Sequence, residues 1–547
     1  MIPRGILLCI LLPVLVTTSA QSPPTTYLIR FNNKSGTPFA PDAPEAFLSP
    51  RAIDRRAVQG ISVDSTDLPV DPVYITTVLA QGDVQLVNRS KWFNAITVRT
   101  SDTVALAAIG ELPFVTQVVL TRRLHGPAPD AGKFTRPMDA RGDRGGGDAD
   151  YGPSFNQLAL MNGQVLHELD ARGQGMLIGV LDSGFDGVDS LPAFAELRDR
   201  GGITLTRDMV EHDGDVYADH WHGRSVLSCM AGIIQGQLIG SATDADYVLL
   251  RSEDAGTENL VEEDNWIAAA ELADSIGCDV INTSLGYTVF DDSLLNHAYA
   301  DMNGTTTRIS IAAGMAAQKG MIPVCSAGNS GETAWYHIGA PADAIDILAA
   351  GAVNGDGQSA AFSSRGPSAD GRVKPDVCAV GEGAIGLRLE GDSIAAINGT
   401  SFAAPILAGM VACLWQLHPD RSAHDIMFAV RSSAHLWSDP NDSLGYGIPD
   451  FQQAHDHLTL TSGIPGTPDH HGIVAYPLPF VDHLTVMVPD GDGNRAALHD
   501  PMGRIVWSAP VSGTGPVTLS DAALRTLAPG AYILRVRGHS SMVVKGD

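Results

Sequence analysis

Three side chains that could together attack a carbonyl carbon stand far apart in the sequence. Asp182 ends an apolar, strand-like run, His222 starts a helix-like segment, and Ser401 follows a Gly-Thr turn. Each alone has an ordinary interpretation as a turn residue, a surface residue or a helix cap. As a set, a hydroxyl at a helix amino end can be a nucleophile, an imidazole its base, and a carboxylate the group that orients the imidazole. The order Asp, His, Ser, with gaps of 40 and 179 residues, therefore points to acyl-transfer chemistry.

The stretch that carries these residues alternates apolar strands with amphipathic helices. Residues 154–460 predict a doubly wound α/β domain whose largely parallel sheet is covered on both faces. Sites in such domains form at the carboxyl ends of the strands, which is where Asp182 is expected. The expected strands are Met176–Leu181, Tyr247–Arg251, Asp279–Leu285, Met321–Ser326 and Ile345–Ala350, and the expected helices are Val261–Ile276, Thr305–Gln318 and Ser401–His418.

The regions on either side of this domain differ from it in composition. Residues 1–20 combine an early Arg4 with a short apolar run and small residues, which is typical of a signal peptide and predicts a secreted or cell-surface protein. Residues 21–125 predict a small α+β domain, and residues 126–153 form a Gly- and Asp-rich linker open to cleavage. Residues 461–547 alternate polar and apolar positions, as in a small antiparallel β-sandwich.

Composition and charge exclude several classes of protein. The chain has 547 residues, of which 44% are hydrophobic, so it is neither a single small module nor largely disordered. Its formal charge of -27 argues against binding to nucleic acid or to anionic membranes.

The cysteines predict neither a disulfide framework nor a metal site. Cys9 lies in the expected signal peptide, and the other five are widely spaced in or beside apolar segments. We therefore expect small buried side chains, at least one of them unpaired. The run Asp490–Asn494 opens like a calcium loop but lacks the glycine and glutamate that such a loop needs, so it predicts a turn.

Further segments around the three residues resemble signatures of the subtilisin-like serine protease (subtilase) family, whose triad has the same order. The resemblance covers about Met176–Phe451. It rests on the segments around Asp182, His222 and Ser401 and on Val280–Gly286, Cys325–Gly331 and Phe362–Pro367 with Lys374–Val377. Arg224 and Ser225 depart from the residues common after His-Gly, and Phe402 stands where Met is common. Neither departure touches the residues that would move protons.

The resemblance implies a role for each matching residue. Ser401 would be the nucleophile, His222 the general base and acid, and Asp182 the group that orients the imidazole, while Asn329 would donate a hydrogen bond to the oxyanion. The strand residues Ser284, Leu285 and Gly286 would pair with a peptide substrate, and with Ala327 and Gly328 would line a pocket for apolar side chains. No cofactor is implied. Structural calcium is common in the family, but no ligands can be assigned here, so no metal site is predicted.

The flanking domains also resemble parts of secreted subtilases. The amino-terminal domain, with Tyr27–Phe31 and Lys91–Ala95, is similar to an inhibitory propeptide, which implies a precursor that cuts itself within the linker. The tail resembles a type IX secretion sorting domain from Tyr476 to Lys545, with Leu478 where Asn is frequent. The implied partners are protein or peptide substrates, the chain's own propeptide and the type IX secretion machinery of a Bacteroidetes-type bacterium.

Two other functions remain open from the sequence. A surface binding protein could keep the fold without catalysis, although the complete set of catalytic residues argues against this. An esterase could use the same nucleophile, but a peptide-pairing strand at Ser284–Gly286 favours a secreted serine endopeptidase.

Overall fold

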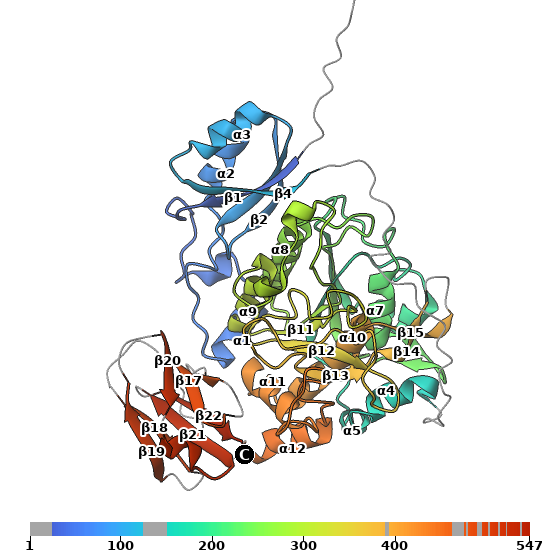
Figure 1. Cartoon of the computed structure of the whole chain (residues 1–547). Helices are drawn as coiled ribbons and strands as arrows, with labels where there is room; N and C mark the ends of the chain where they lie inside the picture. Colours follow the sequence, from blue (N-terminus) through green and yellow to red (C-terminus); the bar gives the residue numbers. More distant parts are fainter. Residues whose placement is uncertain are drawn as a thin grey trace, which may run out of the picture.

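The computed structural model describes three folded units along the chain (Figure 1). It describes residues 25–123, 150–388 and 393–461, and in the tail residues 475–476, 480–488, 495–500, 504–511, 515–520, 522–536 and 539–546. The expected signal peptide, nearly all of the expected linker, Leu478 and the run 490–494 lie outside the described residues.

The amino-terminal unit is an antiparallel four-stranded sheet with two helices. The strand order is β2-β3-β1-β4, and every neighbouring pair is antiparallel. Each of these helices starts at an Asp, Asp71 or Asp102, whose carboxylate accepts hydrogen bonds from backbone N–H groups of the first turn. The elements are β1 (Thr25–Phe31), α2 (Pro72–Leu79), β2 (Val84–Ser90), β3 (Ala95–Thr100), α3 (Thr103–Gly110) and β4 (Val115–Arg122), with a separate helix α1 (Pro50–Val58) between β1 and α2.

The central unit is built on a seven-stranded parallel sheet. Its order is β13-β12-β11-β10-β5-β9-β6, so the chain changes direction across the sheet between β5 and β10. This confirms the expected α/β class. The strands are β5 (Leu177–Asp182), β6 (Ile203–Asp208), β9 (Asp246–Arg251), β10 (Val280–Thr283), β11 (Ile322–Ser326), β12 (Leu348–Val353) and β13 (Val377–Val380).

Helices cover both faces of this sheet, because alternate strand residues point to opposite sides. Ile178 and Val180 pack with the helices on one face, and Leu177 and Leu181 pack with those on the other. Helices α7 (His222–Ala231) and α10 (Thr400–Leu417) belong to the first face, and α8 (Val261–Ile276) and α9 (Arg308–Gln318) to the second. The remaining elements of the unit are α4 (Phe155–Ala159), α5 (Gln164–Glu168), α6 (Ala195–Asp199), α11 (Ala423–Ser432), α12 (Phe451–Thr461), β7 (Ile233–Ile234), β8 (Leu238–Ile239), β14 (Glu382–Leu387) and β15 (Ile394–Asn398).

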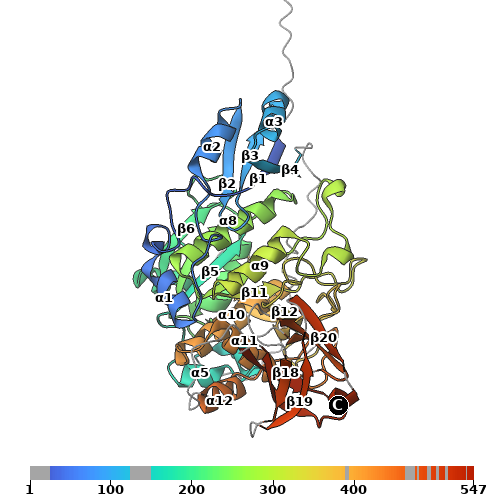
Figure 2. The same ribbon diagram turned by 90° about the vertical axis from the view of Figure 1, so that its left-hand side faces the viewer.

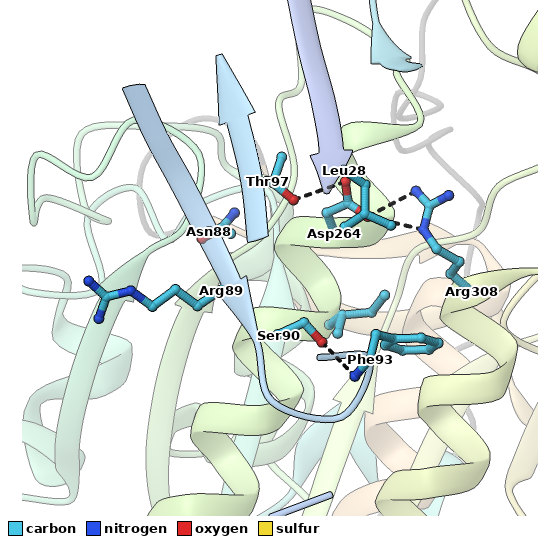
Figure 3. Close-up of a pocket in the computed structure, with 9 residues that line it drawn as sticks. Leu28, Asn88, Arg89, Ser90, Phe93, Thr97, Asp264 and Arg308 are labelled. Atoms are coloured by element: carbon cyan, nitrogen blue, oxygen red, sulfur yellow. Dashed lines mark hydrogen bonds and ion pairs between the residues drawn. The ribbon is translucent and has the colours of Figure 1, made fainter. Parts of the chain in front are cut away.

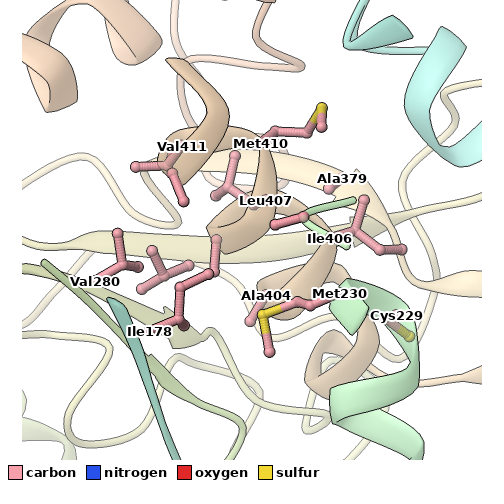
Figure 4. Close-up of a cluster of buried hydrophobic side chains, with 14 of the residues drawn as sticks. Ile178, Cys229, Met230, Val280, Ala379, Ala404, Ile406, Leu407, Met410 and Val411 are labelled. Carbon is pink, nitrogen blue, oxygen red and sulfur yellow. The ribbon is translucent and has the colours of Figure 1, made fainter. Parts of the chain in front are cut away.

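Helix α10 runs through the core. Its side chains Ile406, Leu407 and Met410 pack among Ile178 and Val280 of the sheet (Figure 4). The helix is long and apolar enough to cross a membrane by composition alone, but 89% of it is buried inside this unit. Burial of this kind fixes the start of the helix, where Ser401 lies, against the carboxyl ends of the strands.

The tail forms two antiparallel sheets around one apolar core, as a β-sandwich requires. One sheet has the order β16-β17-β20 and the other β19-β18-β21-β22. Leu484 of the first sheet and Leu498 and Leu534 of the second belong to the same buried cluster. The elements are β16 (Ala475–Tyr476), β17 (His483–Val488), β18 (Arg495–His499), β19 (Ile505–Pro510), β20 (Gly515–Ser520), α13 (Ala522–Arg525), β21 (Gly530–Val536) and β22 (His539–Lys545).

Some boundaries differ from the sequence-based expectation. The expected strand Ile345–Ala350 is wrong at its start, because Asp346 has a left-handed backbone (φ 57°) that a strand cannot contain, and β12 begins at Leu348. Helix α9 begins at Arg308 rather than Thr305, because the Thr307 side chain caps it. The strand expected over Asp279–Leu285 ends at Thr283, which releases the next residues from the sheet.

The amino-terminal unit lies along helix α8 of the central unit, as Figures 1 and 2 both show. The contact is polar and buried. The Glu271 carboxylate accepts hydrogen bonds from the Ser90 hydroxyl and from the backbone N–H groups of Lys91 and Trp92. Burial raises the pKa of Glu271 to about 7, although the nearby Lys91 ammonium opposes this.

Two more carboxylates of α8 bind the same unit. Asp264 accepts hydrogen bonds from Thr97 and from Arg308 of α9, and both side chains point toward it in Figure 3. Asp274 is fully buried and pairs with Arg55 at 2.7 Å, Arg56 at 2.7 Å and Lys91 at 2.9 Å. Three cations of the amino-terminal unit therefore share one carboxylate of the central unit.

Replacing Asp274→Ala should destabilise the chain strongly, because it removes the carboxylate shared by three buried cations. Among the described residues, Arg56 alone of the three keeps a second carboxylate partner, Asp67 at 3.0 Å. Removal of one partner from a buried ion pair costs about 3–5 kcal/mol. Urea unfolding of the whole chain should show a loss of this size, whereas the exposed Asp420→Ala should change the free energy of unfolding by less than about 0.5 kcal/mol. Equal stability of the two variants would mean that the buried cluster contributes little to holding the units together.

Candidate active site

Asp182 and His222 form the first part of the site. Asp182 is the last residue of β5 and is 0% exposed, and His222 is the first residue of α7. The His222 Nδ1 lies 2.8 Å from the Asp182 Oδ1, which also accepts the Ser183 backbone N–H at 2.7 Å. With its Nδ1 proton held by the carboxylate, the imidazole has Nε2 available as a base.

A glycine lets the helix approach the strand this closely. A Cβ atom on Gly223 would lie 2.3 Å from the Gly184 carbonyl oxygen and 2.9 Å from the Cβ of Asp182. No side chain fits there without moving the backbone. The Gly after His222 is therefore required by packing rather than by chemistry.

Ser401 lies at the other side of the same opening. It is the second residue of α10, and it lines one cleft together with His222. The neighbouring Phe402 ring lies 5.8 Å from the His222 ring, measured between centroids. The Ser401 hydroxyl donates to the Ser284 carbonyl at 3.3 Å, and the Ser284 hydroxyl donates to the Ser401 carbonyl at 2.8 Å. These two bonds fix the start of α10 against the residues that follow β10.

Asn329 is oriented by a residue that the sequence analysis did not single out. Its Oδ1 accepts hydrogen bonds from the Thr400 backbone N–H at 2.9 Å and from the Thr400 hydroxyl at 3.0 Å. The Thr400 hydroxyl also accepts the Gly328 N–H at 3.2 Å. With Oδ1 occupied, the amide Nδ2 of Asn329 remains as a donor toward the cleft that Asn329 lines. The signal in the sequence was the position of Thr400 directly before Ser401.

The residues expected to contact substrate line the same cleft. They are Ser284, Leu285, Gly286, Ala327 and Gly328. The first three follow the carboxyl end of β10, and the last two follow β11, so adjacent parallel strands deliver both sets to one edge of the sheet. Of the residues predicted for the site, only Asp182 lies behind the surface of the cleft, where it contacts His222.

Acidic residues also line the cleft, which the sequence analysis did not predict: Glu253 and Glu258 are among its lining residues. Carboxylate oxygens of Glu253, Glu258 and Glu262 lie within 4.8 Å of one another. These carboxylates already have partners: Glu253, for example, accepts the Tyr287 hydroxyl, and Glu262 accepts the backbone N–H groups of Asp254 and Asn259. Because these bonds occupy the carboxylates, the group does not make a strong case for a metal site.

The departures after His222 are accommodated inside the fold. Arg224 is buried, pairs with Asp186 at 3.1 Å and donates to the Arg388 carbonyl at 2.6 Å. Ser225 is fully buried and donates to the Trp221 carbonyl within the helix. Both side chains serve packing and leave the Asp182 to His222 contact intact.

All five cysteines in the described residues are free and buried, as expected of small core side chains. Burial raises the pKa of the Cys229, Cys325 and Cys378 thiols to about 12, and it raises the pKa of the other two as well. None of them is placed to act as a nucleophile.

The central unit and the amino-terminal unit each match a known protein family. Residues 173–455 match the model of the Subtilase family, and residues 26–134 match the Peptidase S8 propeptide domain of Bacteroidota. The chain is 29% identical over 261 residues to membrane-bound transcription factor site-1 protease of Mus musculus, covering 46% of this chain and 22% of that protein. It is 28% identical to the serine protease AprX of Bacillus subtilis (54% of this chain, 67% of the relative) and to subtilisin of Bacillus pumilus (51% and 90%).

The burial of the five thiols predicts how slowly they react with a disulfide reagent in the folded chain. In the chain without residues 1–20, which carry Cys9, the five remaining thiols should resist a disulfide reagent at pH 8 while the chain is folded. At that pH the buried thiols stay protonated, because their pKa lies far above it. All five should react after unfolding in guanidinium chloride. Rapid reaction of two or more thiols in the folded chain would contradict their placement.

Proposed function

The chain belongs to the subtilase family, and from that membership and the geometry of its cleft we propose that it is a secreted serine endopeptidase made as a self-processing precursor. The observation that carries the proposal is the meeting of His222, held by the buried Asp182, with Ser401 and Asn329 at one cleft. A peptide carbonyl that enters this cleft meets a nucleophile, a base and an amide donor together.

In the proposed reaction His222 takes the proton of the Ser401 hydroxyl as the oxygen attacks the peptide carbonyl. The Asp182 carboxylate, bound to Nδ1, would stabilise the imidazolium that forms and keep the tautomer in which Nε2 can accept the proton. The imidazolium then gives its proton to the leaving amine, and an acyl-enzyme ester on Ser401 remains. Water, activated by the same imidazole, hydrolyses the ester and restores the hydroxyl.

Asn329 and a backbone N–H at Ser401 would stabilise the negative oxygen of the tetrahedral intermediate. The start of α10 supports this role, because the amino end of a helix carries a partial positive charge. Thr400 acts as a positioning residue, since it holds the Asn329 Oδ1 and so turns the Nδ2 group outward. The donor is then fixed before the reaction begins.

Substrate would bind as an added strand along Ser284–Gly286. These residues have left the sheet but line the cleft, so their backbone groups can pair with an extended peptide. The side chain before the cut bond would enter a pocket between this segment and Ala327–Gly328. Because the walls of that pocket are small and uncharged, we expect it to accept apolar side chains.

The amino-terminal unit, residues 21–125, would act as the inhibitory propeptide, and the cut would fall in the linker 126–153. The match to a propeptide domain and the buried contact with α8 support this assignment. For the tail, residues 461–547, we propose the role of a type IX sorting domain, supported by its sandwich fold and by the sequence resemblance. Residues 1–20 would direct export.

The precursor should shorten itself, and Ser401→Ala should abolish the cut because the nucleophile is gone. Gel electrophoresis and mass spectrometry of the purified chain would place the new amino terminus within residues 126–153. The exposed Ser190→Ala is the matched control and should process at the wild-type rate. If Ser401→Ala shortens as fast as the wild type in protease-free conditions, another enzyme makes the cut.

Removal of the oxyanion donor by Asn329→Ala should lower kcat by about 10²–10³ and change KM little, because the bond forms only in the transition state. That magnitude was measured in a subtilisin, so only its transfer to Asn329 is predicted here. Steady-state hydrolysis of a peptide substrate tests it, with the exposed Asn156→Ala as control. A large rise in KM with kcat unchanged would instead assign Asn329 to substrate binding.

A further inference from the structure

Several acidic side chains lie in or beside the cleft that holds Ser401. Glu253, Glu258 and Asp291 line the cleft itself. Asp254 lies between the two glutamates in the chain, and Asp292 directly follows Asp291. The chain as a whole is acidic, so carboxylates on its surface need no special explanation. Two features of this acidic group do need an explanation.

The first feature is the segment that meets these carboxylates. Strand β4 is the last strand of the amino-terminal unit; it ends at Arg122, and Arg123 follows it directly in the chain. The Arg122 guanidinium lies 3.8 Å from the Asp254 carboxylate, and the Arg123 guanidinium lies 3.7 Å from the Asp292 carboxylate. Two adjacent cations are thus placed against two carboxylates from different loops, and the neighbours of both carboxylates in the chain, Glu253 and Asp291, line the cleft.

The second feature is the state of Asp292. Its side chain is only 9% exposed. Its Oδ1 accepts the Leu294 backbone N–H at 3.1 Å, but within the described residues no hydrogen bond reaches its buried Oδ2. A buried carboxylate oxygen without a donor is costly, and the cation nearest to it is Arg123. Departure of the amino-terminal unit would remove that cation and leave a buried anion next to Asp291, which lines the cleft.

The positions of the two arginines in the sequence show on which side of the cut bond these carboxylates would bind a substrate. Arg122 and Arg123 precede the linker 126–153, in which the proposed self-cut falls. In that first substrate both arginines therefore lie on the amino-terminal side of the cut bond. A later substrate that binds in the same direction would present its residues upstream of the cut to the same carboxylates.

We infer that the cleft selects peptides with an arginine or lysine upstream of the cut bond, beyond the side chain in the apolar pocket, and that Asp292 and Asp254 are the residues that recognise it. The inference rests on the proposed function and adds a substrate class to it. The pair Arg122–Arg123 is then the first occupant of this site, and it fits because it has the sequence that the enzyme prefers.

Positional scanning of peptides tests the inference on the processed wild-type protein. The probes are pools of internally quenched decapeptides in which a single fixed Arg or a single fixed Gln is moved through the positions on either side of the cut bond. Arg should raise kcat/KM at least tenfold over Gln at one or more positions upstream of the apolar pocket, and at no position downstream of the cut.

Substitutions then assign the preference to residues. Asp292→Asn keeps the size of the side chain and should lower the Arg-to-Gln ratio at least fivefold, and Asp254→Asn should lower it less, because Asp254 is more exposed. The exposed Asp356→Asn, on a turn that does not line the cleft, should leave the ratio unchanged. Labelling of Ser401 by a fluorophosphonate at the wild-type rate would show that each variant retains a folded site.

The precursor provides a second measurement. Replacing both arginines, Arg122→Gln with Arg123→Gln, should slow self-processing at least fivefold. Arg89→Gln is the matched control in the same unit, since Arg89 is exposed and points away from the other side chains in Figure 3. Processing of the double variant at the wild-type rate would contradict the inference.

The outcomes separate this inference from the proposed function. If Ser401 is labelled and peptides are cut, but Arg and Gln are equivalent upstream, the basic specificity is wrong and the endopeptidase stands. If Asp292→Asn retains the full preference for Arg, Asp292 is not the residue that recognises it. If Ser401 is not labelled and no pool is cut, the proposed function fails and the specificity falls with it.

Discussion

The hydrogen bond between Asp182 and His222 is the contact on which the site depends. A carboxylate that is fully buried must be matched by strong donors, and here it receives the imidazole Nδ1 and the Ser183 N–H on one oxygen. The bond requires β5 to end at this residue and α7 to begin at His222, and the absence of a side chain at Gly223 permits the close approach. The sheet, the helix and the glycine are thus all needed to hold the His222 imidazole in its orientation.

Charged contacts join the amino-terminal unit to the central unit at two places. At helix α8 its cations and backbone N–H groups satisfy the buried carboxylates of Asp274 and Glu271. At the cleft its last two arginines approach Asp254 and Asp292. The first contact anchors the unit on α8, and the second places its last two arginines against the loops that carry Glu253 and Asp291 of the cleft. In the proposed function, a propeptide held in this way would be the first substrate of the enzyme.

Local patterns in the sequence predicted much of the fold and most of the candidate site. Apolar runs gave the central strands, and the motifs around Ser284, Asn329 and Ser401 gave residues that line one cleft. Edge strands such as β6 and β13 and the hairpin β14–β15 were missed, since they are short or mix polar with apolar residues. The start of β12 was misplaced because propensity does not reveal the left-handed backbone at Asp346.

Contacts between distant segments could not be predicted in the same way. The Thr400 bonds to Asn329 join residues 71 positions apart, and the pairing of Arg123 with Asp292 depends on how two units dock.

Reaction with a fluorophosphonate tests the central claim most directly, because the reagent modifies a serine only when a base activates it. The account predicts one modified residue, Ser401, in the processed protein and almost no reaction in His222→Ala. A folded wild-type protein that stays unmodified, or a His222→Ala variant that reacts equally fast, would contradict it.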